Sequence, residues 1–323
     1  MNRPHSATTA AAAATAMSQP PLSADMAAFV ESSRAFAVDD PAITAQRQAY
    51  ARLCAALAPA DYQGLAVDDH RAGDVPLRLV APREPAANRP ALLYLHGGGW
   101  MLGDLDSHGF LAARLARWLG LAVLLVDYRL APEHPYPAAL EDALRAWNWL
   151  GDEASRLGLD ETRLAVAGDS AGGNLAAALC LALRTQGRQQ PRLQALIYPA
   201  LTDRLLPSER HHAQAPLLSA ADWRACLEVY LPERRDRAEP LALPLQATDH
   251  AGLAPAFIAV ARRDPLRDHG HAYARVLRAA GTPCRLWEGA GLLHGALRAP
   301  GARAEALRRA LESSLARALV RSA

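Results

Sequence analysis

Short apolar runs recur along the chain, and most are followed by a longer segment with helical spacing of its apolar positions. The predicted strands cover 91–95, 121–126, 163–167, 193–197, 256–260 and 284–287. Most of these lack polar alternation, which is typical of a sheet buried on both faces. The predicted helices cover 111–119, 138–157, a segment ending near 185, 268–280 and 302–320. This alternation predicts a mostly parallel sheet flanked by helices.

Three parts of the chain do not follow this alternation. Residues 65–68 and 75–80 are predicted to pair as an antiparallel hairpin at one edge of the sheet. Residues 23–58 have helical spacing interrupted by proline, and they precede the sheet. Residues 202–249 are rich in proline and arginine and contain one amphipathic helix near 220–230. The helical segment before the sheet is too short for a core of its own, so we expect it to form a lid or flank.

The composition is that of a soluble globular protein, with 51% hydrophobic and 21% charged residues. The formal net charge is +2 and no basic run is interleaved with aromatic residues, so nucleic acid is not an expected partner. All 35 basic residues are arginine. This excludes a Schiff-base lysine, a phosphate-loop lysine and Ser–Lys catalysis. No apolar stretch approaches the ~20 residues of a membrane span.

The four cysteines and the first 18 residues indicate the cellular compartment in which we expect the protein to reside. Cys54, Cys180, Cys226 and Cys284 are far apart and form no C-x-x-C pair, so we expect buried, reduced thiols and a cytoplasmic location. Residues 1–18 are expected to be disordered. Their alanine- and threonine-rich run lacks the apolar core of a signal peptide, and Met17 is an alternative start to Met1.

The strongest chemical motif lies between the predicted strand at 163–167 and an alanine-rich helix. Residues 168–172 read G-x-S-x-G, the elbow that lifts a serine hydroxyl above the edge of a sheet. The turn is so tight that glycine is needed two residues before and after Ser170. The pentapeptide alone fits equally well a tight turn whose serine caps the helix. The rest of the chain has to decide between these interpretations.

A serine nucleophile needs a base, and in a parallel sheet the base should follow the carboxyl end of a strand. His294 lies directly after the last predicted strand and is the candidate. His269 and His271 lie near a helix start and are expected to face solvent. His211 and His212 are expected to form a surface pair in the irregular segment.

The acid that orients the base should follow a strand between the elbow and His294. Asp264 comes directly after the strand at 256–260 and is the candidate. Asp268 is expected to cap the following helix instead. Glu288 ends the last strand and stays an alternative. The resulting order of Ser170, Asp264 and His294 is that of the α/β-hydrolase arrangement.

Acyl transfer also needs hydrogen-bond donors aimed at the developing oxyanion, and unobstructed backbone amides can serve. The glycines at 97–99 follow a predicted strand, and we expect the amides of Gly97, Gly98 and Ala171 to be these donors. Ala171 begins the elbow helix, where the helix dipole adds to its amide. The alternative, a phosphate-binding loop, lacks a lysine and a G-x-G-x-x-G frame.

Seven motifs together resemble the hormone-sensitive lipase family (family IV) of bacterial esterases. They lie at 96–100 (HGGGW), 128–133 (YRLAPE), 135–138 (PYPA), 168–173 (GDSAGG), 196–199 (LIYP), 264–268 (DPLRD) and 294–295 (HG). Two departures from the family pattern flank candidate catalytic residues: Ala261-Arg262-Arg263 before the acid, and Ala296 after the base. They concern the shape of the pocket and the environment of the acid more than the reaction.

The resemblance implies an eight-stranded α/β-hydrolase sheet with a helical cap. The implied organisation is a tail (1–18), N-terminal cap helices (19–60), a core (61–201 and 250–323) and a cap region (202–249). Trp100, Tyr198 and the cap helices are candidate walls of the substrate pocket, with core packing an equal alternative for Tyr198. The edge strand at 284–287 is a candidate for pairing in a homodimer.

The activity implied is hydrolysis of short- to medium-chain carboxylic esters through a Ser-His-Asp triad and an acyl-enzyme, with no metal or organic cofactor. The same triad fits cleavage of an amide, carbamate or lactone, or acyl transfer to an alcohol. A non-catalytic small-molecule receptor on this fold is a further alternative, although such receptors typically lose the histidine that is present here as His294. Asp169, the variable residue of the elbow, is expected to orient the loop without being catalytic.

Overall fold

A computed structural model describes residues 21–84 and 86–320. The expectations of a disordered tail at 1–18 and of a start at Met1 or Met17 lie outside the described residues. In the described part of the chain, no helix is both long and apolar enough to cross a membrane.

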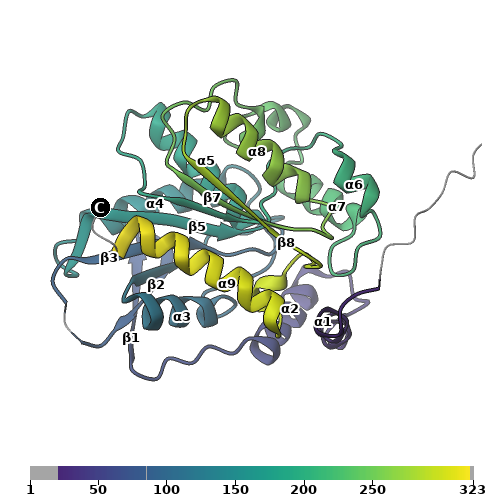
Figure 1. Cartoon of the computed structure of the whole chain (residues 1–323), viewed down its shortest axis with the longest axis horizontal. Helices are drawn as coiled ribbons and strands as arrows, with labels where there is room; N and C mark the ends of the chain where they lie inside the picture. Colours follow the sequence, from purple (N-terminus) through teal and green to yellow (C-terminus); the bar gives the residue numbers. More distant parts are fainter. Residues whose placement is uncertain (1–20, 85, 321–323) are drawn as a thin grey trace, which may run out of the picture.

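The sheet has eight strands in the order β1-β2-β4-β3-β5-β6-β7-β8 (Figure 1). Their bounds are β1 Leu65–Ala72, β2 Val75–Pro82, β3 Arg89–Leu95, β4 Ala122–Val126, β5 Leu159–Asp169, β6 Gln194–Ile197, β7 Ala256–Ala261 and β8 Cys284–Gly289. β1 and β2 form the predicted antiparallel hairpin, β2 pairs antiparallel with β4, and the remaining neighbours are parallel. The predicted eight-stranded, mostly parallel α/β-hydrolase sheet is confirmed.

Helices cover both faces of this sheet, as Figure 1 shows. Their bounds are α1 Ala24–Arg34, α2 Ile43–Leu57, α3 Gly109–Leu119, α4 Ala138–Asp152, α5 Ala171–Thr185, α6 Pro207–His211, α7 Ala220–Tyr230, α8 Arg267–Ala279 and α9 Ala302–Leu315. α4, α5 and α8 pack in one hydrophobic cluster, and α1, α3 and α9 in the other. Along β3, Leu93 and Leu95 belong to the first cluster and Leu92 and Tyr94 to the second. Burial on both faces explains why the strand is uniformly apolar.

Some predicted bounds differ from the structure at element ends. β5 begins at Leu159 rather than at 163, because Leu159 pairs with Arg89 of β3 ahead of a register shift. The residues between Leu159 and Leu164 are polar, which hides this start in the sequence. α4 ends at Asp152, and the chain then turns through Gly158, which has a left-handed φ of +69°. α6, with five residues, is too short to show a helical period in the sequence and was not predicted.

The helices outside the strand–helix alternation lie at the carboxyl end of the parallel strands. Arg47 Nε of α2 donates a 2.9 Å hydrogen bond to the carbonyl of Met101, in the loop after β3. Tyr230 of α7 stacks on Trp100 in the same loop, with ring centroids 4.2 Å apart. Figure 1 shows α1, α2, α6 and α7 at one end of the molecule. This is the end at which the loops after β3, β5 and β7 meet.

The cysteines are free, as expected, but only Cys54 and Cys180 are buried. Cys226 on α7 and Cys284 on β8 are half-buried. The expectation of four buried thiols is therefore wrong for these two. β8 lies at the edge of the sheet, where one side of the strand has no neighbour within the described residues.

Candidate active site

The elbow is a strand–turn–helix junction in which Ser170 joins β5 to α5. Ser170 has φ +54° and ψ −116°, a strained conformation for a residue with a side chain. A Cβ on Gly168 would collide with the carbonyl of Gly172, and one on Gly172 would collide with the carbonyl of Leu95. The Ser170 amide donates to the carbonyl of Ile197 at 2.9 Å. Glycine is therefore required on both sides of the serine, as the motif predicts.

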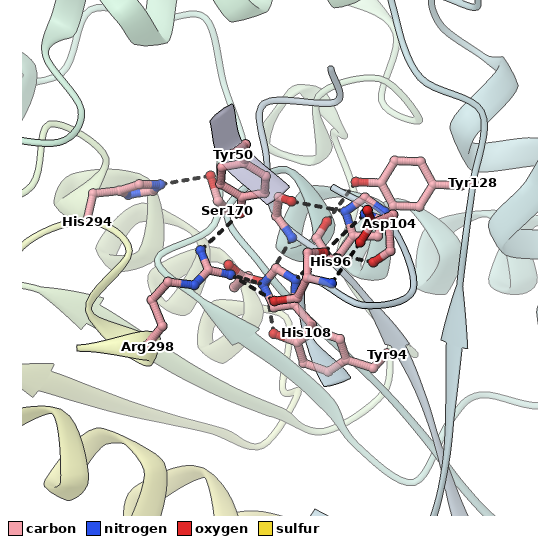
Figure 2. A network of polar contacts seen from close by, with 12 residues as sticks. Tyr50, Tyr94, His96, Asp104, His108, Tyr128, Ser170, His294 and Arg298 are labelled. Atoms are coloured by element: carbon pink, nitrogen blue, oxygen red, sulfur yellow. Dashed lines mark hydrogen bonds and ion pairs between the residues drawn. The ribbon is translucent and has the colours of Figure 1, made fainter. Parts of the chain in front are cut away.

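The structure brings Ser170, His294 and Asp264 together at the ends of three strands. His294 Nε2 lies 2.9 Å from Ser170 Oγ, and His294 Nδ1 lies 2.7 Å from Asp264 Oδ2 (Figure 2 shows the serine–histidine contact). Asp264 is fully buried, and its other carboxylate oxygen accepts a 2.8 Å hydrogen bond from the Leu266 amide. Each contact has the geometry that a nucleophile, a base and an orienting acid require.

The two other acids are engaged elsewhere. Glu288 accepts from Arg262 Nε at 2.7 Å and lies 3.0 Å from His271 Nε2. Asp268 accepts a 2.8 Å hydrogen bond from the Ser208 amide and pairs with Arg267. Its predicted role as a helix cap is wrong, because Asp268 is already the second residue of α8.

Two histidines expected at the surface are buried. His269 is completely buried on the inner face of α8, and its Nδ1 accepts a 3.0 Å hydrogen bond from the Leu201 amide. His212 is also buried, although His211 beside it is exposed. Position near a helix end does not reveal which face a residue occupies. The tertiary packing of α6 against α8 decides it.

The glycine triplet after β3 differs from the prediction at its first residue. The Gly97 amide donates a 2.9 Å hydrogen bond to Asp169 Oδ1, so it is not available to an oxyanion. The assignment of Gly97 as a donor is corrected on this ground. Gly98 and Gly99 have left-handed φ values of +133° and +63°. Their amides, like that of Ala171, donate to no acceptor within 21–84 and 86–320.

Trp100 and Tyr198, the candidate pocket walls, are both buried. Trp100 is 1% exposed, between Tyr230 and Trp223 of α7, and is part of the core beneath that helix. Its interpretation as a pocket wall is wrong. Tyr198 is 1% exposed, and its ring centroid lies 4.7 Å from that of His294. It therefore packs against the imidazole, in agreement with the core alternative.

A buried polar network beside the elbow was largely missed from the sequence (Figure 2). The carboxylate of Asp169 accepts from Tyr94 Oη at 2.8 Å and from the Gly97 amide, and it lies 3.1 Å from His108 Nε2. Arg298 Nη2 is 3.1 Å from the same His108 nitrogen. The one available signal was a charged residue, Asp169, directly after the apolar stretch 164–168 of β5. No sequence pattern pointed to His108 or Arg298.

Burial and nearby charges shift the pKa of Asp169, the acid of this network, in opposite directions. Burial by itself raises the pKa of Asp169, but the nearby His108 and Arg298 and the hydrogen bond from Tyr94 hold the pKa well below its ordinary value. Burial lowers the pKa of His108, and it lowers the pKa of His96 to about 4. Asp169 is thus a buried carboxylate and His96 a neutral imidazole at neutral pH.

The cavities of the molecule differ in their relation to these residues. One cavity, of about 720 Å³, lies at the amino ends of β6, β7 and β8, away from Ser170. A cavity of about 360 Å³ is lined by Arg263 and Leu293, next in sequence to Asp264 and His294. A cavity of about 300 Å³ lies between α1, α2, Leu102 and Leu217. Of these three cavities, the two smaller ones are lined by residues adjacent to the candidate site: Arg263 and Leu293 in one, and Leu102 of the loop after β3 in the other.

A sequence model described as the alpha/beta hydrolase fold matches residues 92–298, which include every candidate catalytic residue. The chain belongs to this family. Carboxylesterase NlhH of Mycobacterium tuberculosis is 43% identical over 255 residues, which cover 76% of this chain and 79% of the relative. Ethyl acetate hydrolase of Pseudomonas putida is 43% identical over 229 residues, covering 69% of this chain and 72% of the relative.

Solved structures give the same result. A bacterial heroin esterase superposes with a TM-score of 0.86 at 34% identity, over 93% of this chain and 98% of that chain. A thermostable esterase from Pseudomonas putida ECU1011 superposes with a TM-score of 0.88 at 28% identity, over 94% of this chain and 99% of that chain. The comparisons confirm the predicted family and the predicted enzyme class, the carboxylesterases.

Proposed function

We propose that the protein hydrolyses carboxylic esters of short to medium chain length through Ser170, His294 and Asp264. The observation that carries the proposal is the continuous chain of contacts from Ser170 Oγ to His294 Nε2 (2.9 Å) and from His294 Nδ1 to Asp264 Oδ2 (2.7 Å). The names of the curated relatives support the ester as substrate class.

In the first half of the reaction, Ser170 Oγ attacks the acyl carbon while His294 Nε2 takes the hydroxyl proton. The bond from the acyl carbon to the alcohol oxygen then breaks, and His294 returns the proton to the leaving alcohol. In the second half, His294 activates water, which releases the acid and restores the serine. Asp264 holds the imidazole with its proton on Nδ1 and stabilises the imidazolium.

The negative charge on the carbonyl oxygen needs donors at the elbow. We assign this role to the amides of Gly98 and Ala171 and, in place of Gly97, to that of Gly99. The engagement of the Gly97 amide by Asp169 supports the replacement. Ala171 is the first residue of α5, so the helix dipole adds to its amide.

We further propose that α1, α2 and residues 202–249 form the cap over residues 61–201 and 250–323. The cavity between α1 and α2 is the proposed substrate space. Its volume of about 300 Å³ lies at the low end of the ~300–1,000 Å³ usual for ligand pockets. This size favours short and medium acyl chains over long ones.

The test is hydrolysis of p-nitrophenyl butyrate by Ser170→Ala. We expect the variant to lose at least ~1,000-fold in kcat, because the acyl-enzyme cannot form. Ser155→Ala, an exposed position after α4, is the matched control and should retain wild-type turnover. Wild-type activity in Ser170→Ala would refute the triad.

A fluorophosphonate probe separates the enzyme from a receptor of the same fold. We expect it to label Ser170 in the wild type and to leave Ser170→Ala unlabelled. An unlabelled wild-type protein would favour the receptor. A panel of matched esters, amides and lactones then ranks the substrate classes, and faster cleavage of an amide or lactone would overturn the choice of ester.

A further inference from the structure

The carboxylate of Asp169 occupies an unfavourable place for a negative charge. It lies one residue before Ser170 and holds the amide of Gly97, the residue before the proposed oxyanion donors. A Cβ on Gly97 would lie 2.5 Å from Asp169 Oδ2, so the contact is close. An oxyanion formed nearby would be repelled by an uncompensated carboxylate, and repulsion is strong where water is excluded.

Arg298 is a permanent cation close to this carboxylate. Its side chain is largely buried in the short 3₁₀ turn Ala296–Arg298, four residues after His294. Its Nη2 lies 3.1 Å from His108 Nε2, and His108 Nε2 lies 3.1 Å from Asp169 Oδ1. The cation and the anion thus approach the same ring nitrogen, which can accept from Arg298 or donate to Asp169 but not both, and Arg298 acts on Asp169 through its charge.

The same guanidinium also reaches a helix of the proposed cap. Arg298 Nη1 donates a 3.0 Å hydrogen bond to Tyr50 Oη of α2, and the guanidinium carbon lies 5.4 Å from the centre of that ring. Tyr50 is one of the residues that line the 300 Å³ cavity. Figure 2 shows Arg298 between Tyr50 on one side and His108 on the other.

We propose that Arg298 is a positioning residue for the oxyanion loop, the glycine triplet 97–99 after β3: it supplies the counter-charge of Asp169 beside His108 and fixes α2 through Tyr50. With its charge compensated, Asp169 holds Gly97 in place without opposing the oxyanion. One buried side chain thus links α2, the oxyanion loop and the loop that carries His294. The inference rests on the proposed ester hydrolysis.

The first test is the kinetics of Arg298→Met with p-nitrophenyl butyrate. We expect kcat to fall about 10- to 100-fold, as for other small displacements of a reacting geometry, with KM changed less than about threefold. Arg298→Lys keeps the charge and should recover most of kcat. Recovery by Arg298→Lys separates the charge from the shape of the side chain.

The second test is a double-variant cycle with Asp169→Asn. The amide keeps an acceptor for Tyr94 and Gly97 but removes the charge that Arg298 compensates. We therefore expect the kcat of the double variant Asp169→Asn/Arg298→Met to lie within about threefold of the kcat of Asp169→Asn alone. Such a result would be a clear departure from additivity. Losses that multiply would overturn the inference.

The third test is the pH dependence of the kcat ratio between wild type and Arg298→Met. The groups that interact electrostatically with Asp169 are Tyr50, Cys54, Tyr94, His96, His108, Tyr128, Tyr198 and Arg298. Asp104 acts on the neighbouring His96 and His108, and the triad lies beyond Ser170. Loss of the Arg298 charge removes one of the influences that lower the pKa of Asp169, so this pKa rises in the variant. As the pH falls through that raised pKa, Asp169 is neutralised, and the ratio should shrink.

Other titrating groups are controlled by the Asp169→Asn background, where the corresponding ratio should not depend on pH. A ratio that is independent of pH in the wild-type background would indicate a merely structural role and would overturn the inference.

Arg114→Met, which breaks ion pairs between α3 and α9, controls for lost stability and should retain kcat. Wild-type kcat in Arg298→Met together with an inactive Ser170→Ala would reject this inference and leave the proposed function intact.

Discussion

Gly99 and Gly187 both hold a left-handed backbone, but only Gly99 faces another element. Their φ values are +63° and +65°. A Cβ on Gly99 would lie 2.7 Å from the sulfur of Cys226 on α7, whereas one on Gly187 would have no heavy atom within 4 Å. At the scale of single residues, the same backbone conformation therefore has two different consequences.

This pair gives a test of the oxyanion loop. In Gly99→Ala, the methyl group must displace the loop or α7, so we expect kcat for p-nitrophenyl butyrate to fall about 100-fold, as when one oxyanion donor is lost. Gly187→Ala should cost about 1 kcal/mol of stability from the same backbone strain and leave kcat unchanged. Equal kcat values in the two variants would remove Gly99 from the proposed oxyanion hole.

At the scale of elements, α2 presents different residues to the cavity and to solvent. Leu53 lines the 300 Å³ cavity, while Ala55, two residues later, is exposed. Arg47 and Tyr50 attach the same helix to the loop after β3 and to Arg298. α2 is therefore the element through which we expect the cap to influence chain-length preference.

Leu53→Trp tests this role of α2. The larger side chain would fill part of the cavity, so hydrolysis of p-nitrophenyl octanoate should fall at least ~10-fold relative to that of the acetate. Ala55→Trp places the same side chain on the solvent side and should leave the ratio of the two rates unchanged. An unchanged ratio in Leu53→Trp would place the acyl chain elsewhere, and the cavity beside Arg263 and Leu293 is the next candidate.

At the scale of the whole molecule, a network of ion pairs joins two helices on one face of the sheet. Arg114 of α3 pairs with Glu305 and Glu312 of α9, residues 191 and 198 positions away. Burial raises the pKa of Glu305, but hydrogen bonds from Arg114, Arg309 and Arg308 outweigh it and lower the pKa to about 2. Glu305 thus binds a proton less readily in the folded protein than in the unfolded chain.

The sign of this shift predicts how stability depends on pH. A depressed pKa contributes stability that is present above the unfolded value, about 4.3 for glutamate, and is lost as the pH falls toward 2. We expect Arg114→Met to lower the unfolding free energy by about 1 kcal/mol at pH 7 and by less near pH 2. Urea unfolding at pH 7 and near pH 2 measures this decrease in unfolding free energy. An equal decrease at both pH values would contradict an ionic contribution from Glu305.

The edge strand β8 is the feature on which the proposal of a homodimer rests. β8 forms an edge of the sheet and offers backbone groups for pairing with a second copy. Light scattering on the purified chain, whose mass is 34.6 kDa, distinguishes a dimer from a monomer. A monomer at all concentrations would exclude pairing through β8.

The strand–helix alternation, the elbow and the candidates Ser170, Asp264 and His294 could all be predicted from the sequence alone. The structure shows these three side chains in close contact. These features are local, because strand burial shows as apolar runs, the elbow requires glycine at fixed spacing, and catalytic groups follow strand ends. The helix Ala220–Tyr230 was predicted for the same reason, since its apolar spacing lies within one segment.

Which groups are buried and which are paired could not be predicted without the three-dimensional arrangement of the chain. The Gly97 amide is taken by a carboxylate 72 residues away, and Arg298 meets Tyr50 across 248 residues. His269 is buried because Trp223 of α7 and the loop after β6 cover it, and Trp100 is buried because α7 covers it. Each of these outcomes depends on a contact between distant segments, which no local pattern of side chains specifies.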